Sequence, residues 1–373
     1  MADSIDDNHS SSISISRIVA AVVLLAGFFA TQQAVADACN IVQGKKYPSS
    51  WKLPATAIDT EDIPVIELDP DAPDNRPLPV YKLDDRTYFL FGNISTLNEK
   101  NRGFNANAGF VVTGEGVIVI DSLGTPKLGR RLISTVQCVT DEPIKYLVVT
   151  HNHPDHAYGA AAFEAIQGLT LIAHPGTIDY NHSETLQTSV EYREQLLPHD
   201  MAGFKPLDAD TYVRNEPFDK LRISLGEVVM DVYNTGKHHS YGDLVIYQPH
   251  AQFLWVSDLV FNQRTTYMGD GDSAQILKAQ DWLLQTFPDA RLIIPGHGSA
   301  QTPPFPMVAK TQDYVERMRE AMLTAVEDGT MMQDAVQNVE FEDWRDVPLY
   351  DSNQRANANF VYREMEQAYF ENF

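Results

Sequence analysis

The sequence predicts a layered α/β fold, and three observations lead to this. Strand-like apolar runs alternate with helix-like segments through the first half of the chain, and a second set of strand-like runs begins after residue 220. Hydrophobic residues make up 43% of the 373 residues, enough for a substantial core. Because a sheet must bury its apolar faces, this order of elements is typical of sheets covered by helices.

The first half supplies strands and helices in alternation. The early strand-like runs are residues 87–91, 109–113 and 117–120, with Gly114-Glu115-Gly116 as a hairpin turn signal between the last two. The later elements are a helix over 125–139 with Pro126 in its first turn, a strand over 144–149, a helix over 157–166 and a strand over 169–173.

The second half begins with a weakly periodic segment, residues 176–220, that reads as an insertion with a helix over 184–197. Strands are then expected at 221–225, 228–233, 244–247, 253–256 and 291–294, with an amphipathic helix over 273–287 before the last of them. The chain from about residue 307 is mostly helix-like, which predicts a C-terminal helical extension over 306–373.

The N-terminus resembles a secretory signal. An apolar run over residues 18–30 follows Arg17, and Ala34-Val35-Ala36 forms a small-residue cleavage pattern. We therefore interpret 1–36 as a signal peptide, 37–80 as an extended lead-in rich in Pro and Asp, and 81–305 as the main domain. This predicts an exported, periplasmic protein, with an uncleaved membrane anchor as the alternative. The sequence leaves open whether Cys39 and Cys138 pair.

The charge balance limits the partners. The chain carries 51 acidic against 28 basic residues, a formal net charge of −23. Such a surface repels phosphate backbones, so we expect a small-molecule substrate and no nucleic acid. Membrane contact is expected only if the N-terminal segment stays attached, and the sequence does not determine the oligomeric state.

A dense group of metal-capable side chains follows the strand predicted at 144–149. The stretch His151-Asn152-His153-Pro154-Asp155-His156 places two histidines on alternate positions, so both point to one side of an extended chain. Pro154 favours extended geometry at the residue before it, and the turn beyond brings the next aspartate and histidine beside the first pair. Imidazole and carboxylate ligands are typical of zinc sites.

Three later motifs stand at the ends of strand-like runs in the same way. They are Lys237-His238-His239-Ser240-Tyr241-Gly242-Asp243, Ser257-Asp258-Leu259 and Pro295-Gly296-His297-Gly298. In layered α/β folds, sites gather at strand ends, so the four motifs are expected to meet in one place.

This ordered set of motifs resembles the metallo-β-lactamase superfamily, from about Asn105 to Gly298. The resemblance implies a four-layer αβ/βα sandwich with a dinuclear metal site, and its metal-site pattern is similar to that of glyoxalase II. It implies that His151, His153 and His239 bind one ion, that Asp155, His156 and His297 bind the other, and that Asp258 bridges them. His238 is the alternative to His239. Asp121 matches a strand-end aspartate that orients ligands.

Residues outside the motifs carry weaker expectations. Tyr241 and Tyr267 are candidates for polarising a substrate carbonyl, although packing is the more ordinary role of each. His174, which follows a strand, belongs to no ligand motif, and Arg193 is expected on a solvated helix face.

The resemblance predicts a metal-dependent hydrolase. Two Zn²⁺ ions, with iron or manganese as other possibilities, would generate a bridging hydroxide that cleaves an ester, thioester, lactone or amide bond. Asp155 would be the catalytic residue that orients the nucleophile. The first alternative is a mononuclear-iron persulfide dioxygenase on the same fold. The second alternative is β-lactamase activity. Asp258 argues against it, because one large class of β-lactamases in the family has a Cys ligand at this position.

Overall fold

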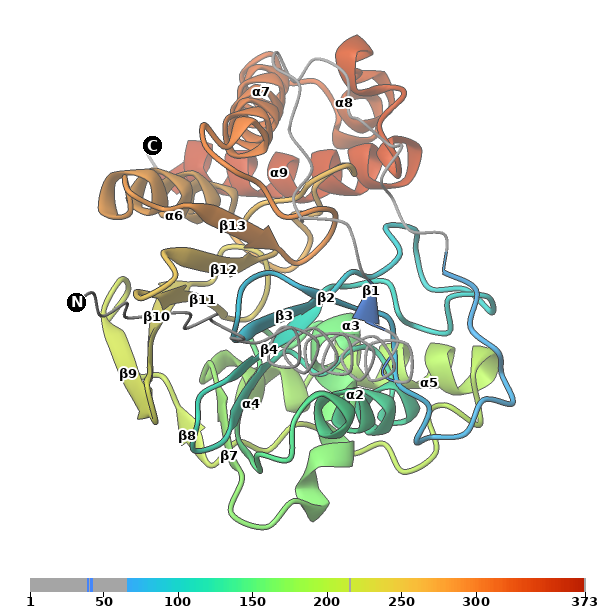
Figure 1. Ribbon diagram of the computed structural model, residues 1–373. Coiled ribbons are helices and arrows are strands. Elements are labelled where there is room, and N and C mark those ends of the chain that lie inside the picture. Colours follow the sequence, from blue (N-terminus) through green and yellow to red (C-terminus); the bar gives the residue numbers. More distant parts are fainter. Residues whose placement is uncertain (1–38, 40, 43–65, 215, 372–373) are drawn as a thin grey trace, which may run out of the picture.

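The computed structural model describes residues 39, 41–42, 66–214 and 216–371. They form two facing sheets with helices on both outer sides, four layers in all (Figure 1). The predicted four-layer α/β sandwich is therefore confirmed. The predicted signal peptide, residues 1–36, lies outside the described residues, as does most of the segment 37–65. Among the described residues, no helix has the length and apolar character that a membrane span requires.

The first sheet has eight strands arranged in chain order. They are β1 (Ile41–Val42), β2 (Val80–Lys82), β3 (Thr87–Leu90), β4 (Ala108–Val112), β5 (Val117–Ile120), β6 (Ile144–Val148), β7 (Thr170–Ala173) and β8 (Thr211–Tyr212). The strands from β5 to β8 run parallel. Their carboxyl ends therefore share one edge, where Asp121 follows β5 and His151 follows β6.

The second sheet has five strands in the order β13-β12-β11-β10-β9. They are β9 (Lys220–Leu225), β10 (Val228–Gly236), β11 (Asp243–Gln248), β12 (Phe253–Ser257) and β13 (Leu292–Pro295). Neighbours are antiparallel except β12 and β13. The ends of β10, β12 and β13 consequently meet at one edge, and the loops that follow carry His239, Asp258 and His297.

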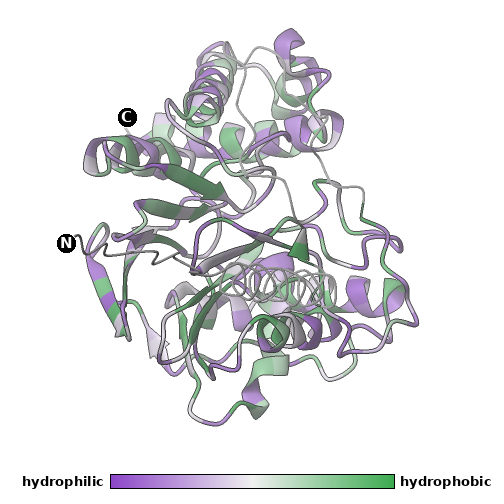
Figure 2. Ribbon diagram, in the orientation of Figure 1, coloured by the Kyte–Doolittle hydropathy of each residue, from purple (hydrophilic) through white to green (hydrophobic). Residues whose placement is uncertain are grey.

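Three buried clusters hold the layers together. Between the sheets, side chains such as Val111 and Ile118 pack with Val232 and Trp255. The outer face of the first sheet packs against α2 (Pro126–Val139) and the 3₁₀ segment η1 (Tyr158–Ala165), and the rest of that side carries α3 (Pro154–Ala157), α4 (Gly176–Asn181) and α5 (Glu184–Leu196). The inner strands are accordingly mostly hydrophobic, whereas β9 and the helices carry both hydrophilic and hydrophobic residues (Figure 2).

The C-terminal helices cover the second sheet (Figure 1). The helix α6 (Ser273–Thr286) is joined by α7 (Pro306–Glu327), α8 (Met332–Asn338), η2 (Glu342–Trp344) and α9 (Tyr350–Glu371). Side chains of α6, α7 and α9 share one buried cluster with the outer face of β12 and β13. The helical character predicted for residues 306–373 is confirmed over the described residues 306–371.

Two element predictions were wrong in detail. The segment predicted as a helix over 157–166 is formed by the 3₁₀ segment η1, because α3 already ends at Ala157. The carbonyl of His156 accepts from the backbone and side chain of Ser122, and the amide of Gly159 donates to Leu123, so neither group is free for an α-helical bond. The segment 176–220 is also more than an insertion, because it supplies β8 to the first sheet.

A disulfide joins the lead-in to the main domain. Cys39 and Cys138 are bonded, with their Cα atoms 5.5 Å apart, and the bridge spans 99 residues of sequence. It fixes the start of the described chain to the last turn of α2, next to the strand pair β1 and β2. The question that the sequence left open about these two cysteines is thereby answered.

Candidate metal centre

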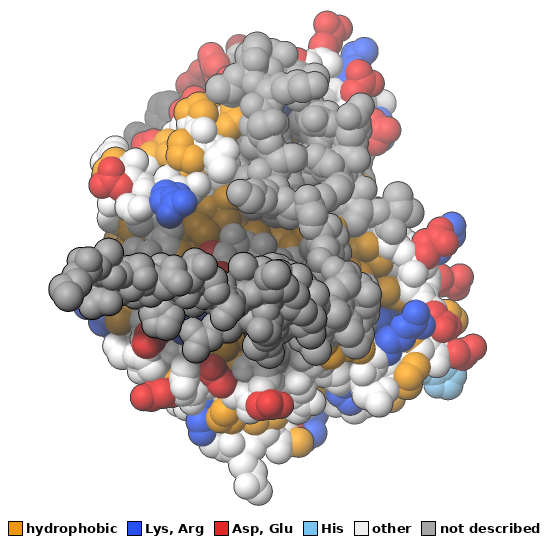
Figure 3. Space-filling view, in the orientation of Figure 1, with side chains coloured by type: hydrophobic (Ala, Val, Ile, Leu, Met, Phe, Trp, Pro, Cys, Tyr) orange, Lys and Arg blue, Asp and Glu red, His pale blue; other side chains and the backbone are white. Residues whose placement is uncertain are grey.

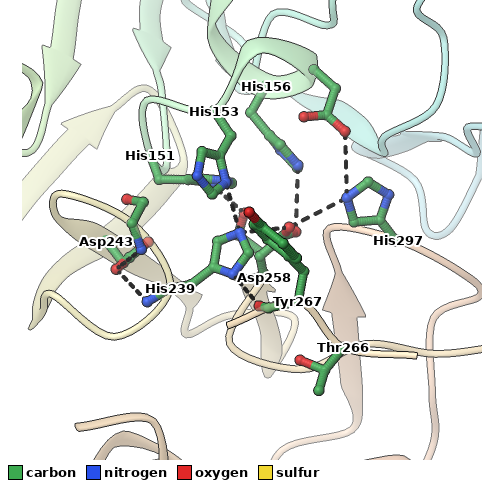
Figure 4. A network of polar contacts seen from close by, with 12 residues as sticks. His151, His153, His156, His239, Asp243, Asp258, Thr266, Tyr267 and His297 are labelled. Carbon is green, nitrogen blue, oxygen red and sulfur yellow. Dashed lines mark hydrogen bonds and ion pairs between the residues drawn. The ribbon is translucent and has the colours of Figure 1, made fainter. Parts of the chain in front are cut away.

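The turn after β6 presents its histidines as the sequence predicted. His153 is extended, with φ −62° and ψ 145°, and Pro154 begins α3 directly after it. This short helix turns the chain so that the rings of His156 and His151 lie 4.3 Å apart between centroids (Figure 4). Asp155 joins His156 in a second group of candidate ligands.

The structure brings all seven predicted ligands together in two adjoining groups. In each group the candidate ligand atoms lie within 4.8 Å of one another. The first group contains His151, His153, His239 and Asp258, and the second contains Asp155, His156 and His297. Most of these side chains are buried, and those of His153 and Asp155 are 12% and 14% exposed.

In the first group, hydrogen bonds at the outer ring nitrogens set the orientation of two histidines. His153 donates from Nε2 to Asp270 over 3.0 Å, and His239 donates from Nδ1 to the carbonyl of Tyr267 over 2.8 Å. The inner nitrogens, His153 Nδ1 and His239 Nε2, then face each other at 2.7 Å. Two lone pairs this close repel unless a cation, either a proton or a metal ion, lies between them.

The second group follows the same design. His156 donates from Nδ1 to Asp121 over 2.8 Å, and His297 donates from Nδ1 to the carbonyl of Asn105 over 2.7 Å. Their free Nε2 atoms point at the Asp258 carboxylate from 3.4 and 3.3 Å. Acceptors on the outer side of metal-binding histidines are a general feature of such sites.

Asp258 lies between the two groups. Its Oδ2 is 3.1 Å from His239 Nε2 in the first group and 3.3 Å from His297 Nε2 in the second. Its Oδ1 has no hydrogen-bond partner among the described residues, and neither has His151 Nε2 or His156 Nε2. Buried polar atoms without partners are costly. The residues therefore fit metal ions, and the assignment of Asp258 as the bridging ligand stays a prediction.

Glycines make room for this arrangement. A Cβ on Gly296 would lie 1.9 Å from Asp258 Oδ1, so only glycine leaves space for the carboxylate. Gly298 has φ +84°, a conformation that favours glycine, and a Cβ there would meet the carbonyl of Asn262 at 1.9 Å. The Pro295-Gly296-His297-Gly298 motif is thus needed for both its ligand and its backbone.

The carboxylates and imidazoles shift each other's protonation. Burial would raise the pKa of Asp258, but the neighbouring imidazoles of His297, His156 and His239 outweigh it and hold this pKa well below its usual range. Burial would likewise raise the pKa of Asp155, but the neighbouring His156 and His297 lower this pKa to about 2. Both carboxylates are therefore ionised at neutral pH.

Two further aspartates hold the ligand loops. Asp121 accepts from Thr150, both backbone and hydroxyl, as well as from His156, which is the orienting role expected for it. Asp243 accepts from the backbone amides of His238, His239 and Ser240 over 2.9 to 3.1 Å. The second aspartate closes the loop that presents His239.

A cavity of about 240 Å³ opens onto both groups. Tyr267 lines it together with Asp155 and Asp258, and burial raises the pKa of the tyrosine to about 12, with a smaller contribution from Asp270. Tyr241 instead packs its ring edge-on against Tyr180, 5.5 Å between centroids, and does not belong to the lining of this cavity.

Two histidines near the site that lie outside the predicted set have structural partners. His238 contacts Thr235 through Nε2, and burial lowers its pKa to about 4, so it lies apart from both groups. His174 donates from Nε2 to Asn234 and accepts from the amide of Gly176 at Nδ1. Both fasten loops near the site.

Sequence reasoning missed four residues at the site. Asp270 contacts His153, which is 117 residues away in sequence, and Asn105 contacts Asp155, which is 50 residues away. Arg264 Nη1 lies 3.0 Å from His297 Nδ1. Arg193, expected on a solvated face, is in fact buried and lies over the Tyr158 ring. The Gly269-Asp270-Gly271 turn was the one available signal, and nothing in its spacing connects it to His153.

Comparisons with known proteins agree with this geometry. The family model described as the metallo-beta-lactamase superfamily matches residues 101–297. Type 2 metallo-beta-lactamases of Bacteroides fragilis and of a Bacillus strain are 26% and 23% identical, over 50% of this chain and 70% and 64% of theirs. A linear primary-alkylsulfatase from a Pseudomonas strain is 39% identical over 49 residues, 13% of this chain and 9% of the other.

A solved structure gives the same result for the fold. A metallo-beta-lactamase from Pontibacter korlensis superposes with a TM-score of 0.51 at 19% identity, covering 64% of this chain and 99% of that one. The family model spans more than half of the chain and contains every predicted ligand. This protein belongs to the metallo-beta-lactamase superfamily.

Proposed function

We propose that the chain is a hydrolase with a dinuclear zinc site that cleaves an ester, thioester, lactone or amide bond of a small molecule. Membership of the superfamily and the His/Asp cluster support a metal-dependent hydrolase. The observation that carries the finer proposal is the pair of adjoining ligand groups with Asp258 between them.

In this proposal His151, His153 and His239 would hold one ion, Asp155, His156 and His297 would hold the other, and Asp258 would contact both. When bound, such ions lower the pKa of water to near neutrality and polarise the oxygen under attack. Seven ligands from four separate loops suit zinc, and iron or manganese accept similar ligand sets.

Asp155 is the proposed catalytic residue. Its carboxylate is ionised, lines the cavity, and accepts from Asn105 Nδ2 over 2.7 Å. Asn105 Nδ2 and, at 3.5 Å, His297 Nε2 approach the same carboxylate oxygen, and the side chain stays partly exposed to the cavity. An oriented carboxylate in this position can accept a proton from the attacking water and pass it to the leaving group.

β-Lactamase activity is the second candidate, because the curated relatives are named metallo-beta-lactamases. Against it stands the ligand set, which has Asp258 and no cysteine within either group. The identity to those enzymes is at most 26%, which leaves the substrate undetermined.

The decisive experiment compares a lactone, a thioester and a β-lactam as substrates of the zinc-loaded protein, with the metal content measured in parallel. The proposal expects two zinc ions per chain and turnover of a substrate in the panel. One iron per chain with oxygen consumption would instead establish a persulfide dioxygenase. Turnover of the β-lactam alone would establish the second candidate.

Asp155→Asn tests the catalytic residue. The exchange keeps the shape and removes the base, so kcat should fall by roughly 100-fold or more. Asp179→Asn is the matched control, because that carboxylate is exposed and contacts only Lys237 at 3.8 Å among the described residues. An Asp155→Asn protein with full metal content and unchanged kcat would remove Asp155 from the mechanism.

We also propose export to the periplasm. The Cys39–Cys138 bridge supports an oxidising compartment, where disulfides persist. Mass spectrometry of the protein recovered from a periplasmic fraction should give a mature chain that begins at Asp37. Recovery of the intact N-terminus in the membrane fraction would establish the anchor instead.

A further inference from the structure

We propose that the substrate extends from the ligand groups into a second cavity, and that the part bound there, its arm, carries hydrogen-bond donors such as amide N–H or hydroxyl groups. This inference rests on the proposed function and names the substrate class. The second cavity has a volume of about 480 Å³ and lies between the β10–β11 loop and the start of α6. Lys237 lines it on the loop side, and Asp272 and Gln275 line it on the side of α6.

The cavity that opens onto the ligand groups is small for a complete substrate. Its volume of about 240 Å³ lies below the range of about 300 to 1,000 Å³ that is usual for small-molecule sites. The second cavity lies within that range, and Asp270 lines both cavities. Because they share this residue, a molecule bound at the ligand groups reaches the second cavity by passing Asp270.

The walls of the second cavity are held by contacts between α6 and the β10–β11 loop. The amide of Asp272 donates to the carbonyl of His238 over 3.2 Å, and Gln275 Nε2 donates to the carbonyl of Thr235 over 2.8 Å. A Cβ on Gly271 would lie 2.0 Å from the His238 carbonyl oxygen, so only glycine permits this close approach. The cavity is therefore formed before a ligand arrives, as is usual for binding sites.

His174, which belongs to no ligand motif, has its place in the wall of this cavity. It follows β7 in the first sheet and donates from Nε2 to Asn234 of β10 over 3.0 Å. Its Nδ1 accepts from the amide of Gly176. Both ring nitrogens are thus used, so His174 joins the two sheets at the cavity and leaves recognition of the arm to other side chains.

The lining of the second cavity offers mainly hydrogen-bond acceptors. Apart from Pro217 and two glycines, every lining residue has a polar side chain. Asp270 uses Oδ2 for His153, and Asp272 uses Oδ1 for two backbone amides of α6. Within the described part of the chain, the other oxygen of each carboxylate and Oε1 of Gln275 accept no hydrogen bond. Three acceptors in one cavity favour an arm that donates hydrogen bonds.

Other kinds of arm suit this lining poorly. A hydrocarbon arm would displace water from the two carboxylates and the amide without replacing the lost hydrogen bonds, which is unfavourable. An anionic arm would be repelled by Asp270 and Asp272, and the one cation of the lining, Lys237, already lies 3.8 Å from Asp179. The lining therefore selects an arm with neutral or cationic donors.

The test uses three acetyl thioesters that differ only in the thiol part. S-Acetyl-N-acetylcysteamine has an arm with an amide, pentyl thioacetate has an apolar arm of the same chain length, and methyl thioacetate is too short to have an arm. With the zinc-loaded protein, kcat/KM for the amide arm should exceed that for the pentyl arm by about 10-fold or more.

Gln275→Met and Gln275→Glu separate recognition of the arm from support of the loop. Both exchanges remove the contact to Thr235, but the glutamate keeps an acceptor in the cavity. Gln275→Met should lower kcat/KM for the amide arm about 3-fold to 10-fold, as for the loss of one hydrogen bond. Gln275→Glu should lose less than about 2-fold, and both variants should hydrolyse methyl thioacetate as fast as the wild type.

Binding of the free thiols gives a readout that is independent of turnover. N-Acetylcysteamine and pentanethiol have the same sulfur group, so the difference in their affinity for the zinc-loaded protein reports the arm. Calorimetry should show that N-acetylcysteamine binds about 10-fold more tightly. Gln275→Met should reduce this preference about 3-fold or more, and Gln275→Glu should preserve it.

Equal kcat/KM for the amide and pentyl arms in the wild type, or equal losses for methyl thioacetate and the amide arm in Gln275→Met, would overturn the proposal. Equal losses in Gln275→Met and Gln275→Glu would also overturn it and assign Gln275 to support of the loop alone. If the wild type hydrolyses none of the three, thioester hydrolysis is removed from the proposed function, while the calorimetry still decides whether the second cavity binds the arm. Circular dichroism of both variants separates these outcomes from misfolding.

Discussion

At the scale of single residues, the site is determined by what lies behind each ligand. Asp270 and Asp121 each accept from the outer nitrogen of one histidine, His153 in the first group and His156 in the second. The two aspartates thus orient ligands of different groups. This separation makes it possible to weaken one predicted ion site at a time.

Asp270→Asn and Asp121→Asn should lower metal affinity at different sites. Each exchange keeps the shape but replaces a charged acceptor, which typically costs about 10-fold to 100-fold in metal affinity. Titration with Co²⁺, followed by its visible absorption, should show one weakened equivalent in each variant. The double variant should weaken both. If both single variants affect the same equivalent, the assignment of His153 and His156 to different ions is wrong.

Metal uptake should release protons. In the metal-free protein, burial lowers the pKa of His239 and of His156, but Asp258 and their other partners outweigh it and raise both pKa values, His156 well above 6.5. These sites therefore retain protons that a metal ion must displace. Affinity should rise with pH and fall as pH drops below these raised values. Calorimetry in buffers of different ionisation enthalpy measures the release, and a buffer-independent enthalpy would contradict it.

The ligands were predictable from the sequence because each follows a strand-like run. His151 to His156 are contiguous in the chain, and His239, Asp258 and His297 each sit at a strand end. The orienting partners were not predictable, since Asp270 meets His153 across 117 residues of sequence and Asn105 meets His297 across 192. Such contacts depend on how loops from both sheets close over one edge, which local patterns do not encode.

At the scale of elements, α9 determines the shape of the loop that follows β12. Asn357 of α9 donates to the carbonyl of Thr266 over 2.9 Å and accepts from the amide of Met268 over 2.9 Å. The residue between them, Tyr267, provides the carbonyl that orients His239. The C-terminal helix thereby supports the residue that orients a ligand of the first group, and Asn353 of the same helix adds a hydrogen bond to the carbonyl of Thr265 over 3.0 Å.

Asn357→Ala should loosen this loop and lower both stability and metal affinity. Loss of the buried amide leaves the Met268 amide without its acceptor and leaves the Thr266 carbonyl with only the longer 3.4 Å contact to Asn353. The expected cost is about 1 to 3 kcal/mol. Asn359→Ala, on the same helix, is the control, because its side chain contacts only Met332 Sδ at 3.9 Å among the described residues. Thermal unfolding and Co²⁺ titration of both variants provide the measurement. If the two variants have the same unfolding temperature and the same Co²⁺ affinity, α9 does not support the metal site.

Most elements were predictable because their periodicity is local. Pro126 lies in the first turn of α2, as predicted, with Thr125 as the capping residue before it, and β5 has the predicted bounds. The exceptions have tertiary causes. Contacts with Ser122 and Leu123 convert the segment after α3 into a 3₁₀ helix, and β10 extends to Gly236 because β11 pairs with it to the end.

At the scale of the whole molecule, the acidic balance agrees with a small-molecule enzyme. Acidic side chains are spread over the described part of the face in Figure 3, with basic ones interspersed rather than joined in one patch. The net charge of −23 belongs to the complete chain. A uniformly acidic protein attracts cations and repels polyanions, so the absence of nucleic-acid binding remains a prediction that a gel-shift experiment can test.

The C-terminal helices after residue 305 share a hydrophobic core with the second sheet. Tyr314 and Met318 of α7 and Val361 of α9 are almost fully buried in the cluster that they share with the outer face of the second sheet. Each such side chain contributes about 1.5 to 3 kcal/mol on burial. The same cluster also buries Met322, Trp344 and Met365 of this segment. The combined loss is therefore comparable with the whole stability of a domain, about 5 to 15 kcal/mol.

A chain shortened to residue 305 should therefore fail to fold, even though all predicted ligands lie before that point. The shortened chain loses the helices that cover the apolar face of α6. It also loses the Asn357 contacts that support the loop orienting His239. Gel filtration and thermal unfolding should show aggregation and no cooperative transition, against a single transition for the full chain. A soluble shortened chain that still binds two Co²⁺ ions would contradict this prediction. It would establish the C-terminal helices as an independent unit and the sandwich as stable without them.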